Sequence, residues 1–387
     1  MIKNKKIWIL SFALIIVMMG FGMIIPIFPF YIEKLGAGGF ELGTLAATAA
    51  LLEFVFGPIW GNISDRIGRK PVLLIGMVGY ALSTFLFGIS THVWMLFASR
   101  AVSGVLSSAV ITTALAYVSD ATIVKERAAG MGQLSAAMAF GMIFGPAFGG
   151  LLAGNSISLP FFISCGMSVI SFAVILLFLP ESHAPSIDKD RKKTVRQDRR
   201  VDIIKAVRGR LGFLFLLVML YSFALSNFEA VFGLYAVDKF GFNPSQVGAV
   251  LTVIAVISAF GKAILCGPVT KQFGEEKVIK GSLAAGAVGY LVLLMAVDFY
   301  TILLATGFFI LSKTLLRPAS LSLISQRSEE TQGALMGAAN SFMSFGRILG
   351  PVWAGFVFDV NVHLPYISGS FFLAISFLLS LKFLTEK

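Results

Sequence analysis

Long apolar runs separated by short polar turns make up nearly the whole chain. A bilayer core demands roughly 20 consecutive apolar residues of an α-helix, and runs of this length recur from end to end. The first run extends to Tyr31, which is longer than the core of a signal peptide, so we expect an uncleaved first span. The pattern predicts an all-α membrane protein whose twelve spans lie at residues 7–32, 40–63, 71–90, 93–119, 129–153, 159–180, 211–236, 244–270, 277–297, 299–325, 332–357 and 363–384.

One long polar segment interrupts this pattern. Residues 181–210 follow Pro180 and hold ten Lys or Arg and five Asp or Glu. We predict a basic cytoplasmic linker there, between a six-helix bundle at residues 1–180 and a second at 211–387. A solvated hinge is favoured over a regulatory site, although the stretch from Val201 onward is a candidate amphipathic surface helix.

The two halves repeat each other. Residues 34–36 recur at 239–241 and residues 140–150 recur at 345–355, both at an offset of 205, and residues 61–68 recur at 267–274, at an offset of 206. Parallel repeats of this kind place a substrate site at their interface near mid-membrane, with the halves rocking around it. The repeat therefore predicts a transporter that works by alternating access.

The charges define a topology rather than a polymer partner. Of the 31 Lys and Arg, 24 lie in the termini, loops and span ends on one side, two (Lys34 and Lys239) lie in the opposite loops, and five lie in the interior of spans. Basic loops stay in the cytoplasm, so we expect a multi-pass protein of the cytoplasmic membrane with both termini cytoplasmic. The net charge of +11 then suits anionic lipid, and no nucleic-acid partner is predicted.

Other function classes find little support in the composition. The chain is 57% hydrophobic and 13% charged, and a soluble domain carries about twice that charge. Cys165 and Cys266 are isolated in apolar helices, and no histidine has metal-ligand spacing, so no disulfide framework, metal or cofactor is expected. Without a phosphate-binding glycine loop or a catalytic cluster, neither ATP drive nor an enzyme is predicted.

Three motifs give the chain a family resemblance. Gly61-x-x-x-Asp65-Arg66-x-Gly68-Arg69-Lys70 between spans two and three resembles motif A of the major facilitator superfamily. In span four, Arg100-x-x-x-Gly104 resembles its motif B. In span five, Gly141-x-x-x-Gly145-Pro146-x-x-Gly149-Gly150 resembles motif C, which is typical of antiporters. The resemblance covers the whole chain and implies the major facilitator fold, with two pseudo-symmetric six-helix bundles, and export in exchange for protons.

The repeat is unequal in charge at the cytoplasmic turns. The second half carries Lys271, Gln272, Glu275 and Glu276 where the first half carries Asp65, Arg66, Arg69 and Lys70. We predict that these turns close an inner gate by pairing with opposing helix ends or charges. The predicted gating group is Gly61, Asp65, Arg66, Gly68, Arg69 and Asp120.

Finer similarity is to the twelve-span drug:proton antiporters of the NorA and Bmr type. It rests on Pro26-x-x-Pro29, Ser226-x-Phe228-Glu229 and Arg317-Pro318-Ala319. The resemblance implies that Glu229 is a protonatable cavity residue. The chain departs from the group at Thr314, where an acid is usual, with Lys313 beside it, and at Glu53, where an amide is usual.

Two acids and five bases lie in the interior of the predicted spans, away from their ends, where charged residues usually face a cavity or a partner. Ser222, Ser226, Glu229 and Gly233 share one helical face, and Glu229 is the first candidate for proton coupling. The alternative is a fixed ion pair with Lys262 or Arg317.

Glu53 is the second proton-coupling candidate, and its alternative role is a salt bridge to Arg347. Arg100 is expected to act structurally or in coupling. Lys313 and Arg317 either neutralise Glu229 or bind an anionic substrate.

Small and aromatic residues complete the candidate site. Gly141, Gly145 and Gly149 form a stripe that lets helices approach closely, and Pro146 can bend the same helix. The further cavity candidates are Asn227, Phe140, Phe144 and Phe228.

The sequence therefore predicts a proton-coupled antiporter that exports small amphipathic compounds, as in drug or multidrug efflux. The alternative is a narrow-specificity exporter of an anionic or zwitterionic metabolite or siderophore. The expected partners are the substrate, protons and membrane lipids, and we expect a monomer.

Overall fold

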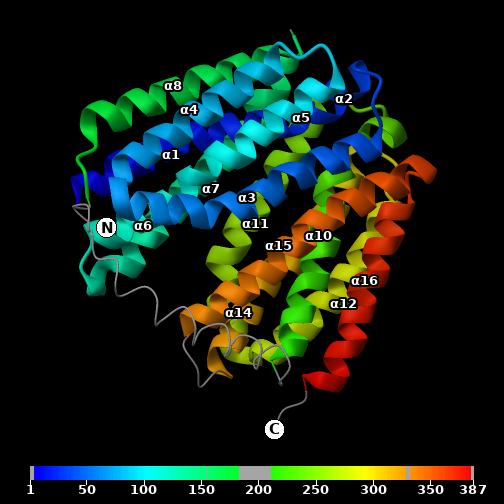
Figure 1. Ribbon diagram of the computed structural model, residues 1–387. Coiled ribbons are helices and arrows are strands. Elements are labelled where there is room, and N and C mark those ends of the chain that lie inside the picture. The colour runs from blue at the N-terminus through cyan, green and yellow to red at the C-terminus, as the bar shows by residue number, and fades with distance from the viewer. Residues whose placement is uncertain (1–3, 155, 183–210, 328–331, 385–387) are drawn as a thin grey trace. The chain divides into compact units, whose positions relative to one another are not determined.

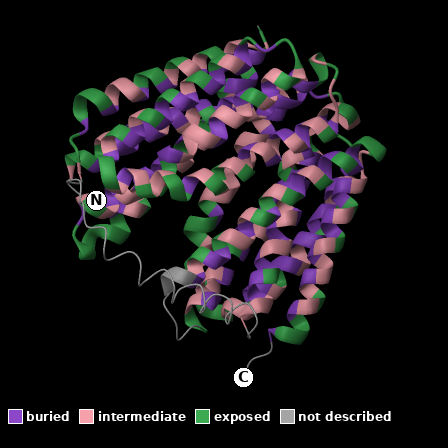
Figure 2. Cartoon of the chain, viewed as in Figure 1, coloured by how far each residue is buried: buried purple, intermediate pink, exposed green. Residues whose placement is uncertain are grey.

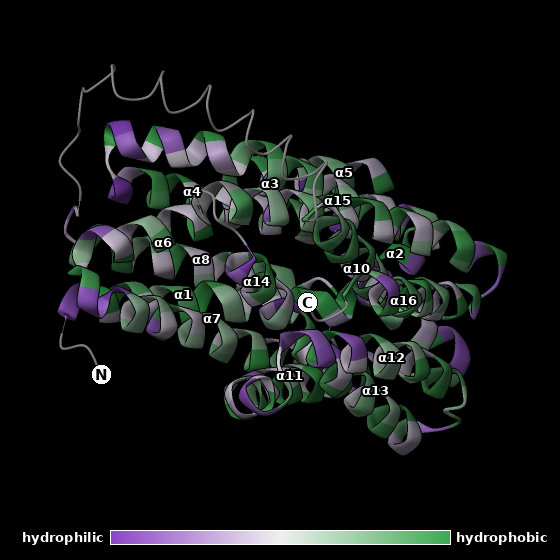
Figure 3. Ribbon diagram, turned by 90° about the horizontal axis from the view of Figure 1, so that it is seen from below, coloured by the Kyte–Doolittle hydropathy of each residue, from purple (hydrophilic) through white to green (hydrophobic). Residues whose placement is uncertain are grey.

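The computed structural model describes residues 4–154, 156–182, 211–327 and 332–384. Every regular element in those ranges is a helix, and twelve segments are long and apolar enough to cross a membrane. Apolar residues cover most of the helical surface, and hydrophilic residues gather near the helix ends (Figure 3). The prediction of an all-α protein with twelve spans is confirmed.

The chain forms two compact units. The first comprises Met1–Ile187 and Gly241–Ala255, and the second comprises Asp188–Phe240 and Val256–Lys387. The predicted division into halves at residues 1–180 and 211–387 stays a prediction. The two units depart from that division at residues 241–255, which pack with the first unit. Most of the predicted linker, including the candidate amphipathic helix from Val201, lies outside the described residues.

The first unit contains the first six spans. They are formed by α1 (Lys5–Ile24), η1 (Ile25–Ile27), α2 (Phe28–Lys34), α3 (Gly39–Ile67), α4 (Arg69–Gly88), α5 (Val93–Val102), η2 (Ser103–Ser107), α6 (Ser108–Ala121), α7 (Val124–Ala153) and α8 (Leu159–Phe178). Two of these spans are interrupted. Span one tightens to a 3₁₀ turn at Pro26, because proline cannot donate a backbone hydrogen bond, and span four widens to a π turn after Arg100.

The other six spans lie mainly in the second unit. They are α10 (Gly212–Phe240), α11 (Pro244–Phe273), α12 (Glu275–Leu294), α13 (Phe299–Thr314), α14 (Leu316–Gln326), α15 (Gln332–Val360) and α16 (Leu364–Phe383). The first part of α11 belongs to the first unit by its contacts. Span ten is broken between α13 and α14, just before Pro318.

Both units pack their helices in the same way. In the first unit α1 packs against α7 and α8, and α4 packs against α8; in the second, α10 packs against α15 and α16, and α12 against α16 (Figure 1). Buried residues lie mainly where helices of a unit face one another, and exposed residues lie on their outer sides (Figure 2). The shared pattern confirms the predicted pseudo-symmetry of two six-helix bundles.

Glycines at equivalent positions allow the closest of these helix contacts. A Cβ atom added to Gly145 of α7 would lie 2.6 Å from the carbonyl oxygen of Met19 in α1. A Cβ atom added to Gly350 of α15 would lie 2.5 Å from the carbonyl oxygen of Phe223 in α10. Small residues therefore set the spacing of the same helix pair in each unit.

The last glycine of the predicted motif C has a different neighbour. The hydroxyl of Ser245, at the start of α11, donates a hydrogen bond of 3.0 Å to the carbonyl oxygen of Gly150. A Cβ atom on Gly150 would lie 3.0 Å from the Cα atom of Ser245. The glycine stripe of α7 therefore serves two contacts within the first unit, one with α1 and one with the start of α11.

Candidate functional site

The second unit contains a cavity of about 670 Å³. Its walls come from α10, α11, α13, α14 and α15, and all of the residues that line it belong to this unit. Its volume lies within the range of ~300–1,000 Å³ that is usual for small-molecule sites. Five charged residues line it: Glu229, Lys262, Lys313, Arg317 and Arg347.

Glu229 and Lys313 form an ion pair on the wall of this cavity. The Lys313 Nζ atom donates to Glu229 Oε1 at 3.1 Å. The Glu229 side chain is 65% exposed, whereas that of Lys313 is 13% exposed and lies 5.6 Å from the ring centres of Phe228 and Phe309. The aromatic rings and Glu229 thus hold the lysine in place, while the carboxylate stays accessible from the cavity.

The other three bases surround this pair. Lys262 interacts electrostatically with Glu229, Lys313 and Arg317, and Arg347 interacts with Glu229. Lys313, rather than Lys262 or Arg317, is the residue that contacts Glu229 directly. Four bases and one ionised acid give the lining a formal charge of 4 − 1 = +3.

The local structure explains how these side chains reach one cavity. Ser222, Ser226 and Glu229 follow the i, i+3, i+4 spacing of one face of α10, and all three line the cavity. Lys313 and Arg317 lie on either side of the break between α13 and α14. The break itself was not predicted, although Pro318 is the sequence feature that marks it, because proline cannot donate a hydrogen bond to the carbonyl group four residues earlier, at Thr314, where α13 ends.

Four other predicted cavity residues do not line this cavity. Asn227 is fully buried, and its amide donates to the Pro365 carbonyl oxygen at 3.0 Å and to the Ser368 hydroxyl at 3.3 Å, so it ties α10 to α16. Phe228 is 2% exposed and packs against Phe309 and Phe232, beneath Lys313. The other two, Phe140 and Phe144, are exposed residues of the first unit that pack against each other, with ring centres 4.7 Å apart.

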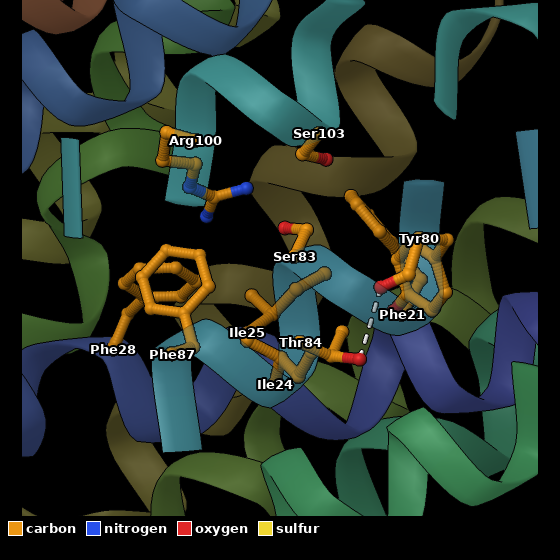
Figure 4. A pocket seen from close by; sticks show the side chains of 10 residues that line it. All are labelled: Phe21, Ile24, Ile25, Phe28, Tyr80, Ser83, Thr84, Phe87, Arg100 and Ser103. Atoms are coloured by element: carbon orange, nitrogen blue, oxygen red, sulfur yellow. Dashed lines mark hydrogen bonds between the residues drawn. The ribbon is translucent and has the colours of Figure 1, made fainter. Parts of the chain in front are cut away.

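Arg100 lies beside a much smaller cavity in the first unit (Figure 4). The volume of about 20 Å³ is enough for about one water molecule. The guanidinium carbon lies 4.1 Å from the Phe28 ring centre and 5.3 Å from that of Phe87. Across the cavity the Thr84 hydroxyl donates to the Tyr80 carbonyl oxygen at 3.0 Å, the bond that Figure 4 marks. Arg100 is thus held by aromatic faces, which favour a planar cation.

Glu53 is exposed on α3 and interacts electrostatically with Arg100. Both residues belong to the first unit, whereas the predicted partner Arg347 belongs to the second. The pairing of Glu53 with Arg347 therefore stays a prediction.

The predicted gating group is connected by charge pairs inside the first unit. Arg69 is 8% exposed, and its guanidinium bonds to Asp65 at 2.7 Å and to Asp120 at 2.8 Å. The backbone turns sharply at Gly68, where φ is +103°. Gly61 lies in α3 near Thr112, and Arg66 is exposed. This group joins the start of α4 to the ends of α3 and α6.

Sequence reasoning missed Glu181 as a member of this group. Its carboxylate accepts hydrogen bonds from the backbone N–H groups of Arg69 at 2.9 Å and Lys70 at 3.0 Å. A carboxylate at a helix N-terminus satisfies free N–H groups and complements the helix dipole. No local pattern links Glu181 to residues more than a hundred positions earlier, so the sequence gives no signal for it.

The second unit has equivalent contacts of opposite polarity. At the repeat offset of 206, Arg69 and Asp120 correspond to Glu275 and Gln326. The Gln326 amide donates a hydrogen bond of 2.7 Å to the Glu275 carboxylate. One residue further on, Arg327 forms an ion pair with Glu276. In each unit the equivalent helix ends are therefore joined, by a base on α4 in the first unit and by acids on α12 in the second.

Twelve spans in two repeats, with charged side chains around a cavity in the membrane region, define a polytopic transporter of small solutes. The profile of the Major Facilitator Superfamily matches residues 10–235 and 214–387. The chain belongs to this superfamily, whose members are transporters rather than enzymes, and it is a multi-pass protein of the cell membrane.

The similar proteins agree with this membership. Multidrug resistance protein 2 of Bacillus subtilis is 31% identical over all of this chain and 97% of its own length. Quinolone resistance protein NorA of Staphylococcus aureus is 27% identical over 94% of this chain and 92% of its own.

Among solved structures, a bacterial homologue of the lysosomal transporter Spinster has a TM-score of 0.81, at 14% identity, over 98% of this chain and 97% of that one. The human organic anion transporter MFSD10 has a TM-score of 0.69, at 20% identity, over 98% of this chain and 100% of that one. At these identities the two structures support the shared fold alone.

Proposed function

We propose that this protein is a proton-coupled antiporter that exports small amphipathic compounds across the cell membrane by alternating access. The single observation that carries the proposal is the cavity of the second unit, in which an accessible carboxylate is held against one lysine among further bases. The similarity to multidrug resistance protein 2 and to NorA supports drug or multidrug efflux as the activity.

Glu229 is the proposed proton site. Its carboxylate faces the cavity, where protons can reach it, and its charge is compensated by Lys313 when it is ionised. Protonation would break that compensation and change the charge of the cavity by one unit. Antiport requires that the proton and the substrate disfavour each other's binding, since linkage is reciprocal.

Further parts of the proposal rest on the first unit and on topology. Glu53 is the second proposed proton-coupling residue, and its electrostatic interaction with Arg100 is the proposed link to span four. Arg69, Asp65 and Asp120 act as the proposed inner gate. Both termini are placed in the cytoplasm on the basis of the basic loops, and a monomer is the proposed working unit.

The proposal can be tested in proteoliposomes with an acidic interior. We expect the purified protein to accumulate a fluorescent amphiphile, ethidium or a dansylated amino acid, and to lose this activity when nigericin collapses the pH gradient. Glu229→Gln should abolish the pH-driven part, whereas Lys382→Gln, a change at an exposed lysine near the end of α16, should not. Accumulation that ignores the pH gradient would contradict the proposal.

A further inference from the structure

The charges around the cavity of the second unit are unbalanced in a way that indicates its ligand. We propose that this cavity binds zwitterionic amphiphiles, compounds that carry a carboxylate and a cationic nitrogen on an apolar body. This inference rests on the proposed transport function and names the substrate class for the same cavity.

The carboxylate would be bound by the three bases that Glu229 does not contact directly. Lys262, Arg317 and Arg347 line the cavity, and Glu229 is the one acid among its lining residues. Since Lys313 already contacts that acid, the surplus of positive charge lies on these three side chains. Charged groups in a membrane span are costly without a counter-charge, and arginine is well suited to bind a carboxylate through two parallel hydrogen bonds.

The cationic nitrogen would be bound by Glu229. Lys313 bonds to Oε1, and the carboxylate side chain remains 65% exposed. A ligand ammonium can therefore approach this carboxylate from the cavity side without removing the lysine from its aromatic contacts. A purely anionic ligand would form no favourable contact with Glu229 and would be repelled by the negative charge of this carboxylate.

The apolar body of the ligand would contact the uncharged walls. Tyr221, Leu225, Leu321 and Met343 lie between the charged positions of the lining. A cavity of about 670 Å³ has room for an aromatic ring system together with two small charged groups. Mixed apolar walls with a few convergent polar groups are usual for small-molecule sites.

Three forms of one fluorescent probe test the proposal at equilibrium. Nε-dansyl-lysine is a zwitterion, its methyl ester is a cation, and its Nα-acetyl derivative is an anion. We expect the purified protein at a pH of about 6, where the ester is fully cationic, to bind the zwitterion at least about tenfold more tightly than the ester, and more tightly than the acetyl derivative, as measured by dansyl fluorescence. Loss of a hydrogen bond to a charged group corresponds to about a tenfold loss of affinity or more.

Variants assign the two ends of the ligand. Arg317→Gln should weaken the zwitterion and the anion by about tenfold and leave the ester unchanged, whereas Glu229→Gln should weaken the zwitterion and the ester but not the anion. Lys382→Gln removes a lysine outside the cavity and should change none of the three affinities. Thermal melting of each variant confirms that it is folded.

Ester binding as tight as that of the zwitterion, or equal weak binding of all three probes, would overturn the inference. Because no pH gradient is used, this result is independent of the flux assay. Proton-driven accumulation of ethidium by a protein with no preference for the zwitterion would refute the substrate class and leave the transport function standing.

Discussion

The ion pair between Glu229 and Lys313 joins α10 to α13 on the wall of the cavity. The spacing of Ser222, Ser226 and Glu229 along one helix predicts which residues of α10 face the cavity. The sequence offers Lys262, Lys313 and Arg317 as partners of Glu229 but cannot choose among them, because they come from separate helices. Asn227 shows the same limit, since only the packing of α16 explains why this amide is turned away from the cavity.

Asp298 provides a pH-dependent test at the scale of one residue. It precedes α13, and its carboxylate accepts hydrogen bonds of 2.8 Å from the backbone N–H and the hydroxyl of Thr301. The backbone hydrogen bond from Thr301 lowers the pKa of Asp298 below its ordinary value of 3.8. The cap therefore stabilises the protein above the unfolded-state pKa, and this contribution is lost as the pH falls through the lower folded-state pKa.

We expect Asp298→Ala to lower the melting temperature at pH 7, because the cap is lost. The difference from the wild type should shrink below a pH of about 3.8, where the carboxylate takes up a proton. Asp298→Asn is the matched control, since asparagine also caps helices but does not titrate, and it should retain most of the stability at pH 7. A difference for the alanine variant that is constant with pH would contradict this role.

At the scale of helices, close approach is set by glycine at fixed places. Gly145 and Gly350 occupy equivalent positions in α7 and α15, and each faces a backbone carbonyl group of its neighbour. The glycine stripe of α7 could be predicted from its spacing. Its contact with the start of α11 could not, because nothing in the local pattern identifies Ser245 as a partner of Gly150.

We expect Gly145→Ala to destabilise the first unit. The new methyl group would lie 2.6 Å from the Met19 carbonyl oxygen and 2.7 Å from the Gly22 Cα atom, so α1 and α7 must move apart. Overpacking of this kind costs roughly 1–3 kcal/mol. The measurement is the melting temperature of the purified protein in detergent.

Gly132→Ala in the same helix is the matched control. A Cβ atom there has no neighbour within 4 Å, and alanine favours a helix over glycine, so this variant should melt at the same temperature or slightly higher. Equal losses of stability in both variants would show that helix geometry, rather than the contact with α1, explains the effect.

At the scale of the molecule, the two units share one packing scheme and differ in charge. The twelve spans, the repeat and the superfamily could be predicted, because bilayer thickness fixes span length and the repeat preserves glycine and proline positions. The contacts that join α4 to α6 and α12 to α14 show what the sequence leaves open. Their inverted polarity follows from residues at an offset of 206, but their pairing is a result of three-dimensional packing.

The central claim is that Glu229 exchanges a proton for the transported compound, and proton release on binding tests it most directly. A compound that accumulates in the proteoliposome assay would be added to the purified protein in weakly buffered detergent solution, and the change in pH would be recorded. In solutions acidic enough to protonate Glu229, we expect the wild type to release protons in proportion to the compound bound. Glu229→Gln, given enough compound to saturate its weaker site, should bind with no release. Binding by the wild type without proton release, or equal release by both proteins, would contradict the account.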